Sequence, residues 1–382
     1  MRTVRIAAAL GLAGILALGA PLCAMAGTEK PESMDQETWE RLQDNVLEYD
    51  ELEDLVELYN PMYRQMVSNI DLSLKPIEDA AAGLRGAADD MMADARGMKD
   101  VNDILSKAYR SAAKGYREGA KNFDKILRSA QSGTRNILGS TRKQMTAGVQ
   151  QLMLGYYQAL ASKELIDTGA ELAQAAWEST VTQRNLGMAT DTDVESAQKA
   201  FQSAGSRQQT LDDQLTGLKQ QLLYMTGWSY DAQSDVGAPP VPDLSRIEAM
   251  DFEADLNRAI GNNYTLIEQR SVSGKSTASH TAKFRTLEES EAKLKIQLES
   301  LYQAVLEGKM TYEAAQTALE SARITMNGTE TKYQMGMVGR LEYLQLKTAY
   351  LQQKMAADQA ALSLVQDMET YYWAVEGLAD IS

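Results

Sequence analysis

The sequence has very few of the residues on which catalytic and metal sites depend. It contains one cysteine, Cys23, and one histidine, His280, among 382 residues. His280 stands in a stretch rich in Ser, Thr and Lys, which is more typical of a solvated loop residue than of a ligand or a base. The sequence also lacks a Gly-rich phosphate loop, a Ser/His/Asp set and metal ligands at a recognisable spacing. We therefore expect no enzyme activity, no bound metal and no cofactor.

Proline, phenylalanine and tryptophan are scarce as well. The seven prolines leave residues 77–238 and 243–382 free of the residue that interrupts helices most strongly. Phe and Trp number four each, while alanine is abundant, and this composition suits close helix–helix contact more than a thick core. The expected fold is all-α, with little or no β structure.

One long apolar run is present, at the N-terminus. Two arginines precede an apolar run over residues 6–22, and residues 24–26 follow the small-x-small pattern of a signal-peptidase site. This arrangement predicts a signal peptide over residues 1–26, with an N-terminal anchor helix as the alternative. Lipidation of Cys23 is not expected, because the preceding Leu22 is larger than lipidation signals use. The exported chain would then contain no cysteine, which excludes disulfides and thiol chemistry.

The overall charge is strongly negative. The formal net charge is −15, and it becomes −17 once the two arginines of the predicted signal peptide are removed. A surface with this balance repels nucleic acid and anionic membranes, so both partners are disfavoured. No later segment has enough uninterrupted apolar residues to cross a membrane as a helix.

The segment 332–373 has the most regular apolar pattern in the chain. It contains no glycine or proline between Arg340 and Trp373. One apolar stripe holds Leu341, Leu344, Leu351, Met355, Leu362, Val365 and Tyr372. A second holds Leu346, Tyr350, Ala357, Ala360, Leu364, Tyr371, Ala374 and Leu378. Both have the 3.5-residue spacing of a coiled coil, and they lie roughly 140° apart, so this helix is expected to contact a neighbour on each of two flanks.

The same element occurs earlier in the chain. Residues 183–201 align without a gap with residues 332–350. The paired positions include Gly187 with Gly336, Met188 with Met337, and Asp193 with Glu342. Both helices end in Leu- or Tyr-rich segments, so the sequence indicates an internal repeat.

These motifs, in this order and duplicated, resemble the TolC-type outer-membrane efflux proteins. An Asn-Pro segment at Asn60-Pro61, partly repeated at residues 263–266, extends the resemblance towards the N-terminus. The resemblance implies pairs of long helices in each repeat and a homotrimer that forms a hollow helical tunnel. It also implies a location in the cell envelope and cooperation with an adaptor protein and an inner-membrane exporter.

The predicted organisation follows from the repeat and the linker. We expect a helical region over residues 27–140, a first helical hairpin over 141–227, a Pro-rich linker over 228–246 and a second hairpin over 247–382. Within these segments we predict single helices over 28–59, 141–186 and 252–269, a helix stop at Lys75-Pro76 and a bend over 133–139.

One feature of the family is missing. TolC-type chains carry β-hairpins before their long helices, and such strands would show about ten residues of strict alternation. The corresponding segments, residues 121–141 and 271–285, show no such pattern. We therefore expect the helical part of the family's fold without its membrane barrel.

The resemblance also assigns candidate functional residues. The adaptor-docking turns would be formed by Gly187, Met188, Ala189, Gly336, Met337 and Val338. The entrance constriction would contain Thr192, Asp193 and Glu342, where a threefold ring of carboxylates would favour cations. The alternative for the turns is a plain helical hairpin, and the alternative for Asp193 is a carboxylate that stabilises a helix N-terminus.

Two functions of different class remain open from the sequence. The first is a trimeric helical conduit that works with an adaptor and an exporter. The second is an extracytoplasmic structural or adhesive coiled-coil protein that has no channel activity. The first predicts trimers, whereas the second predicts monomers, dimers or filaments.

Overall fold

The computed structural model describes residues 30–31, 34–229, 234–271 and 277–381, and the predicted signal peptide lies outside these ranges. The described chain is almost entirely helical, as the composition predicts. The helices are α1 (Gln36–Arg41), α2 (Leu52–Tyr59), α3 (Pro61–Gly97), α4 (Asp103–Ala161), α5 (Lys163–Asn185), α6 (Asp191–Met225), α7 (Leu244–Glu248), α8 (Phe252–Asn262), α9 (Tyr264–Ser271), α10 (Thr277–Gln334) and α11 (Arg340–Trp373). Shorter elements are η1 (Tyr49–Glu51), η2 (Ala374–Leu378) and the parallel strands β1 (Val46–Leu47) and β2 (Asp235–Val236).

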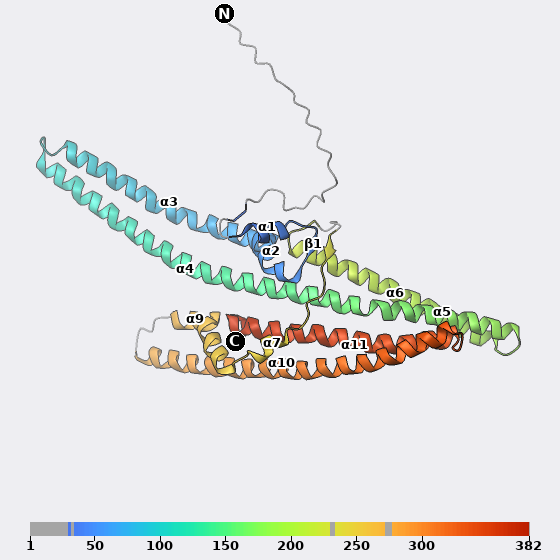
Figure 1. Cartoon of the computed structure of the whole chain (residues 1–382). Coiled ribbons are helices and arrows are strands. Elements are labelled where there is room, and N and C mark those ends of the chain that lie inside the picture. Colours follow the sequence, from blue (N-terminus) through green and yellow to red (C-terminus); the bar gives the residue numbers. More distant parts are fainter. Residues whose placement is uncertain (1–29, 32–33, 230–233, 272–276, 382) are drawn as a thin grey trace, which may run out of the picture.

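The long helices stand side by side in one elongated layer (Figure 1). Helices α4 and α5 follow one another and form a single row. Helix α6 packs on one side of this row and α11 on the other, and α10 packs on the far side of α11. The free edges of the layer are therefore α6 and α10.

Helix α11 contributes to two separate hydrophobic cores. Leu362 and Val365, from its first apolar stripe, pack with α4 and with the N-terminal helices. Leu364 and Tyr371, from its second stripe, pack with α10 and with the short helices that precede it. The prediction that this helix is apolar along two flanks is confirmed.

In both halves of the chain, a buried asparagine lies at the junction between two successive helices. Asn60 precedes α3 and Asn263 precedes α9, with φ/ψ of −58°/120° and −60°/118°. Each side chain accepts a hydrogen bond from a backbone N–H three residues later, at 2.9 and 3.1 Å. Each also donates to a carbonyl near the end of its own repeat, that of Met225 at 2.7 Å and that of Ala379 at 3.0 Å. The same pair of hydrogen bonds thus joins the beginning and the end of each half of the chain.

A glycine faces each of these asparagine turns. Gly227 and Gly377 have φ of 82° and 106°. A Cβ at Gly227 would lie 2.4 Å from Cβ of Tyr59, and one at Gly377 would lie 2.3 Å from the carbonyl oxygen of Asn262. Both positions need glycine for its conformation and for the close approach of the backbone.

Helix α3 and the outer part of α4 form an antiparallel hairpin, residues 61–139, which we call the arm. The arm projects beyond the other helices, at the end of the molecule away from the α5–α6 turn (Figure 1). Small buried residues recur every seven positions on both helices and let the backbones approach closely: Ala81, Ala88 and Ala95 on α3, and Ser106, Ala113 and Ala120 on α4. The Ser106 hydroxyl donates to the Ala95 carbonyl at 2.7 Å.

The arm overturns two local predictions. The helix stop predicted at Lys75-Pro76 is wrong, because α3 continues through Pro76. Pro76 is exposed, so the carbonyl that loses its helical partner faces water. The bend predicted over residues 133–139 is also wrong, because α4 is continuous there. Gly139 serves close packing instead: a Cβ at this position would lie 3.1 Å from the Tyr264 hydroxyl.

The region predicted as one helix over residues 28–59 is divided into α1, β1, η1 and α2. Leu42, Leu47 and Leu52 are buried with 1%, 0% and 0% exposure. Residues five apart point to different sides of a helix, so burying all three requires a change of backbone direction. The middle strand, β1, pairs with β2 of the Pro-rich linker.

Several further expectations differ from the structure. The helix predicted over 141–186 begins earlier, within α4, and is interrupted at Ser162. The boundary placed at residue 140 therefore falls inside a continuous helix. The helix predicted over 252–269 is broken at Asn263. The linker predicted over 228–246 ends where α7 begins, at Leu244. His280 lies in α10 and not in a loop. Among the described residues, no helix has the length and apolarity needed to cross a membrane.

Candidate docking tip

The two repeat turns lie at the same end of the layer (Figure 1). One joins α5 to α6 around Gly187, and the other joins α10 to α11 around Gly336. An ion pair between Arg340 on α11 and Glu178 on α5, 3.6 Å long, connects the two hairpins near their turns. We call this end of the molecule the tip.

Both turns end their first helix with the same hydrogen bonds. Gly187 and Gly336 have φ of 75° and 72°. The N–H of Met188 donates to a carbonyl five residues back at 2.8 Å, and that of Met337 does so at 2.9 Å. This is the Schellman arrangement, in which a glycine in the left-handed region closes the helix. The pairing of these turns, read from the sequence, holds in the structure.

Four large apolar side chains are exposed at the tip. Leu186 and Met188 are 70% and 75% exposed, and Met335 and Met337 are 69% and 72% exposed. The other two predicted turn residues, Ala189 and Val338, are partly buried. Sequence reasoning missed the leucine and the methionine that precede the two glycines. Their occurrence at matching positions of both repeats was the signal that could have found them.

The first turn is closed by a reciprocal cap. The backbone N–H and the hydroxyl of Thr190 donate to the carboxylate of Asp193 at 2.8 and 2.7 Å, and the Asp193 N–H donates back to the hydroxyl at 3.2 Å. These hydrogen bonds from Thr190 lower the pKa of Asp193. Thr192 is exposed beside them. Asp193 therefore has the helix-capping role that the sequence left open as an alternative.

The second turn is closed differently. Gly339 occupies the position of Thr190, and its helix has no side-chain cap. Instead, Tyr343 stacks on Tyr333 with ring centroids 4.2 Å apart, and its hydroxyl donates to Glu330 at 2.7 Å. This hydrogen bond raises the pKa of Tyr343 to about 12 and lowers the pKa of Glu330. The contact between the two tyrosines and the hydrogen bond to Glu330 were not predicted from the sequence.

Glu342 is the least constrained of the predicted constriction residues. It is exposed in the first turn of α11 and makes no hydrogen bond or ion pair with any residue that the structure describes. It lies on the second hairpin, whereas Thr192 and Asp193 lie on the first. A single chain thus places the three residues at the same end of the layer, on two different helices.

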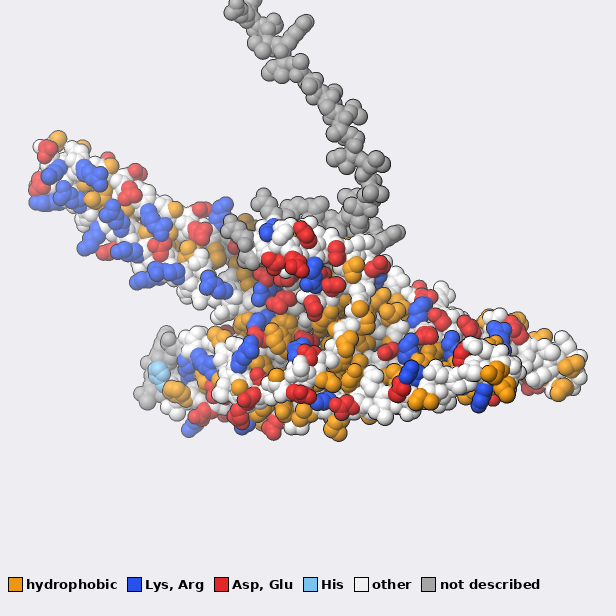
Figure 2. Space-filling model, in the orientation of Figure 1, with side chains coloured by type: hydrophobic (Ala, Val, Ile, Leu, Met, Phe, Trp, Pro, Cys, Tyr) orange, Lys and Arg blue, Asp and Glu red, His pale blue; other side chains and the backbone are white. Residues whose placement is uncertain are grey.

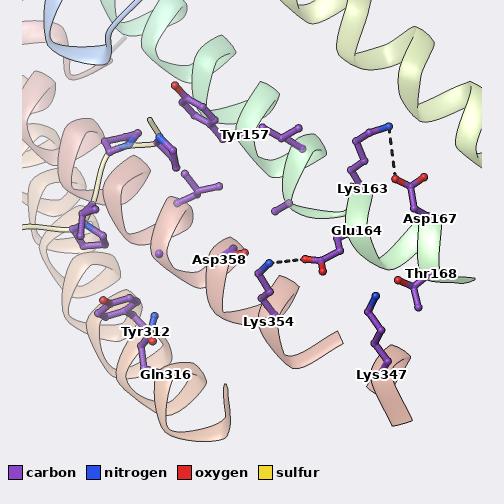
Figure 3. Close-up of a pocket in the computed structure, with 18 of the residues that line it drawn as sticks. Tyr157, Lys163, Glu164, Asp167, Thr168, Tyr312, Gln316, Lys347, Lys354 and Asp358 are labelled. Carbon is purple, nitrogen blue, oxygen red and sulfur yellow. Dashed lines mark hydrogen bonds and ion pairs between the residues drawn. The ribbon is translucent and has the colours of Figure 1, made fainter. Parts of the chain in front are cut away.

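A cavity of about 730 Å³ lies farther along the layer, where the Pro-rich linker crosses α4, α5, α10 and α11 (Figure 3). Its wall contains charged residues from both repeats. Lys354 of α11 pairs with Glu164 of α5 at 2.6 Å, and the neighbouring Lys163 lies 2.6 Å from Asp212 of α6. Burial raises the pKa of Asp358 in the same wall. The Lys354–Glu164 ion pair links the two repeats, whereas the Lys163–Asp212 pair joins α5 to α6 within the first repeat. Neither ion pair follows from the periodicity of the sequence.

Groups of three or more His, Cys, Asp or Glu residues with the geometry of a metal site are absent from the described ranges. The structure brings together hairpin turns, exposed apolar side chains and carboxylates.

The comparisons with known proteins gave structural similarities alone. No family model and no curated protein match the chain. The outer-membrane channel CmeC of Campylobacter jejuni is 11% identical, with a TM-score of 0.44, and the similarity covers 94% of this chain and 92% of that one. The outer-membrane channel OprN is 12% identical, with a TM-score of 0.48 and coverage of 93% and 95%. CusC is 14% identical, with a TM-score of 0.42 and coverage of 80% and 97%.

The names of these neighbours describe outer-membrane or transmembrane channels, and the chain is similar to them in fold. Within the described residues this chain is nearly all helical, and its arm is helical.

Proposed function

We propose that this chain is one protomer of a homotrimeric helical conduit in the cell envelope, an export component that works with an adaptor protein and an inner-membrane exporter. The observation that carries the proposal is the burial of α11 along two flanks. Because α11 contacts the α4–α5 row on one side and α10 on the other, the helices form a layer with two free edges. Such a layer buries its edges when copies join head to tail and close into a ring.

The free edge formed by α10 supports this assembly. Ile296, Met310 and Ile324 are exposed by 69%, 69% and 64%. They are spaced 14 residues apart, which is four turns at the coiled-coil period, so they share one face of the helix. A row of apolar side chains on one face favours burial against another helix. We infer that the α6 edge of the next copy covers it.

The tip would contact the adaptor. Leu186, Met188, Met335 and Met337 offer flexible apolar contacts at the ends of both hairpins, and methionine adapts readily to different partners. A ring of three copies would also bring three Glu342 carboxylates around the opening. Since Asp193 is held in its helix cap, Glu342 would be the main source of cation preference there.

The assembly can be tested by replacing one residue of the α10 row. We expect residues 27–382 to form a trimer in light-scattering measurements, and Met310→Glu to convert it to smaller species, because a charge would be buried in the contact. Phe284→Glu is the matched control: it lies on the same helix with 64% exposure, but at a spacing that places it off the row. A wild-type monomer at micromolar concentration, or equal effects of both variants, would contradict the proposal. Filaments would favour the structural alternative.

A further inference from the structure

The outer part of α4 carries a continuous basic face. It consists of Lys107, Arg110, Lys114, Arg117, Lys121, Lys125, Arg128 and Arg135, all of them exposed. Their spacings of three, four and seven residues place them on one side of the helix. Figure 2 shows Lys and Arg side chains gathered along this hairpin. From the first to the last, the face is about 42 Å long.

The local charge of this segment is opposite to that of the whole chain. Residues 103–139 contain 8 basic and 3 acidic side chains, a net charge of +5, whereas the net charge of the complete sequence is −15. The overall charge, which disfavours anionic partners, therefore hides a positive surface on the arm. The potential along α4 attracts anions although the protein as a whole repels them.

Most of these charges are not neutralised by the protein. Lys107 pairs with Asp103 at 2.7 Å, and Arg117 pairs with Asp89 at 3.2 Å. Within the described residues, the other six members of the face make no ion pair: Arg110, Lys114, Lys121, Lys125, Arg128 and Arg135. Arg128 donates only to the backbone carbonyl of Asp124. Six exposed cations along one helix face form a surface that can bind several anionic groups at once.

The free end of the arm adds an apolar pair. Val101 and Ile104 are exposed by 81% and 82%, the largest values among the exposed large apolar side chains of the described chain. Ile104 stands one turn before Lys107, so it continues the basic face towards the end of the arm. Asp100 and Asp103 are the acidic residues beside it. The face therefore combines a basic row with an apolar end.

We propose that the arm docks through this face on the surface of an anionic phospholipid bilayer. The lysines and arginines would contact the lipid phosphates, and Val101 and Ile104 would enter the boundary between headgroups and acyl chains. A hydrated soluble polyanion would use the charges but would leave the apolar pair in water. The membrane is therefore the partner that matches both features. This proposal does not depend on the conduit.

Vesicle binding by residues 27–382 tests the proposal. We expect cosedimentation with phosphatidylcholine–phosphatidylglycerol vesicles and not with phosphatidylcholine vesicles, with affinity that falls as salt is raised past about 0.15 M. The variant Lys114→Gln, Lys121→Gln, Lys125→Gln should bind about 100-fold more weakly, at about fivefold per lysine. The control variant Lys199→Gln, Arg207→Gln, Lys295→Gln removes the same charge from exposed positions outside the arm, and it should bind like the wild type.

A second variant separates the membrane from other polyanions. Val101→Ser with Ile104→Ser should weaken vesicle binding by about tenfold and leave its salt dependence unchanged. Binding to both kinds of vesicle alike, or an equal loss in the control variant, would overturn the proposal. So would binding to inorganic polyphosphate as tight as to the vesicles together with no effect of the serine variant, since that result would assign the face to a soluble polyanion.

Discussion

The two halves of the chain contain the same asparagine and glycine contacts, but they differ in the segment that follows the asparagine. In both, a buried asparagine caps a helix and donates a hydrogen bond to a backbone carbonyl near the end of its half of the chain. A glycine with positive φ packs against the residue that precedes this asparagine. In the first half the arm follows the asparagine, whereas in the second half α9 and α10 follow it. The contacts needed to close a hairpin are thus duplicated, while the segment inserted between them is free to differ.

The glycines should give the largest effect. Gly227→Ala and Gly377→Ala should each destabilise the protein by about 3–5 kcal/mol, because a positive φ and a backbone clash act together. Gly187→Ala and Gly336→Ala should cost only about 1 kcal/mol, because a Cβ there meets open space. Urea unfolding measures the difference. Equal effects at all four positions would show that the close contacts contribute nothing.

Substitution of the buried asparagines should have the next largest effect on stability. Asn60→Ala and Asn263→Ala should each lower the free energy of unfolding by about 2–4 kcal/mol, through the loss of a helix cap and an unsatisfied buried carbonyl. Asn257→Ala is the control, since its exposed side chain bonds only within its own helix. Its expected effect is within about 0.5 kcal/mol. If only one of the two buried asparagines matters, the repeats are not closed in the same way.

The tip should show a smaller and local difference. Thr190→Ala removes the cap of α6 and should destabilise the first turn by about 1 kcal/mol. Tyr343→Phe removes the hydroxyl bonded to Glu330 and should loosen the second turn alone, by roughly 0.5–1.5 kcal/mol. Hydrogen exchange of the turn amides can assign each effect. Faster exchange in both turns from either variant would mean that the turns are coupled.

The turns should also differ in their response to pH. The pKa of Tyr343 is raised to about 12 from its ordinary value of 10.0. The stabilisation of the second turn by the Tyr343 hydroxyl is therefore complete below pH 10.0 and is lost as the pH rises towards 12. The pKa of Asp193 is lowered from 3.8, so the cap of the first turn is complete above that value and is lost as the pH falls below it. The pKa of Glu330 is lowered as well, so acid weakens both turns.

Alkaline pH should therefore loosen the second turn selectively. Tyrosine carbon resonances of the wild type and of Tyr343→Phe identify the relevant titration. A Tyr343 signal that titrates near 10 would rule out the hydrogen bond to Glu330.

The sequence predicted the parts of the fold that depend on periodicity and on glycine. The two stripes of α11 and the paired turns at Gly187 and Gly336 follow from residue spacing, and the structure contains both. The similarity of Asn60 and Asn263 was also visible, although their hydrogen bonds to distant carbonyls were not. Local pattern identifies such elements because their geometry is local.

The arm was missed because packing overrides local propensity. Pro76 and the glycines near residue 133 suggested interruptions, but both helices continue through these positions. Small buried residues at seven-residue intervals let α3 and α4 pack closely in the outer part of the arm. The charged cavity wall escaped notice for a related reason. Lys354 and Glu164 are separated by 190 positions in the sequence, and only the fold brings them together.

The most direct test of the account is electron microscopy of residues 27–382, viewed along the helices. If the layer closes through its α6 and α10 edges, end-on averages should show a threefold ring of helices around an open centre. Averages that show isolated single layers, or a bundle with no central opening, would contradict the conduit.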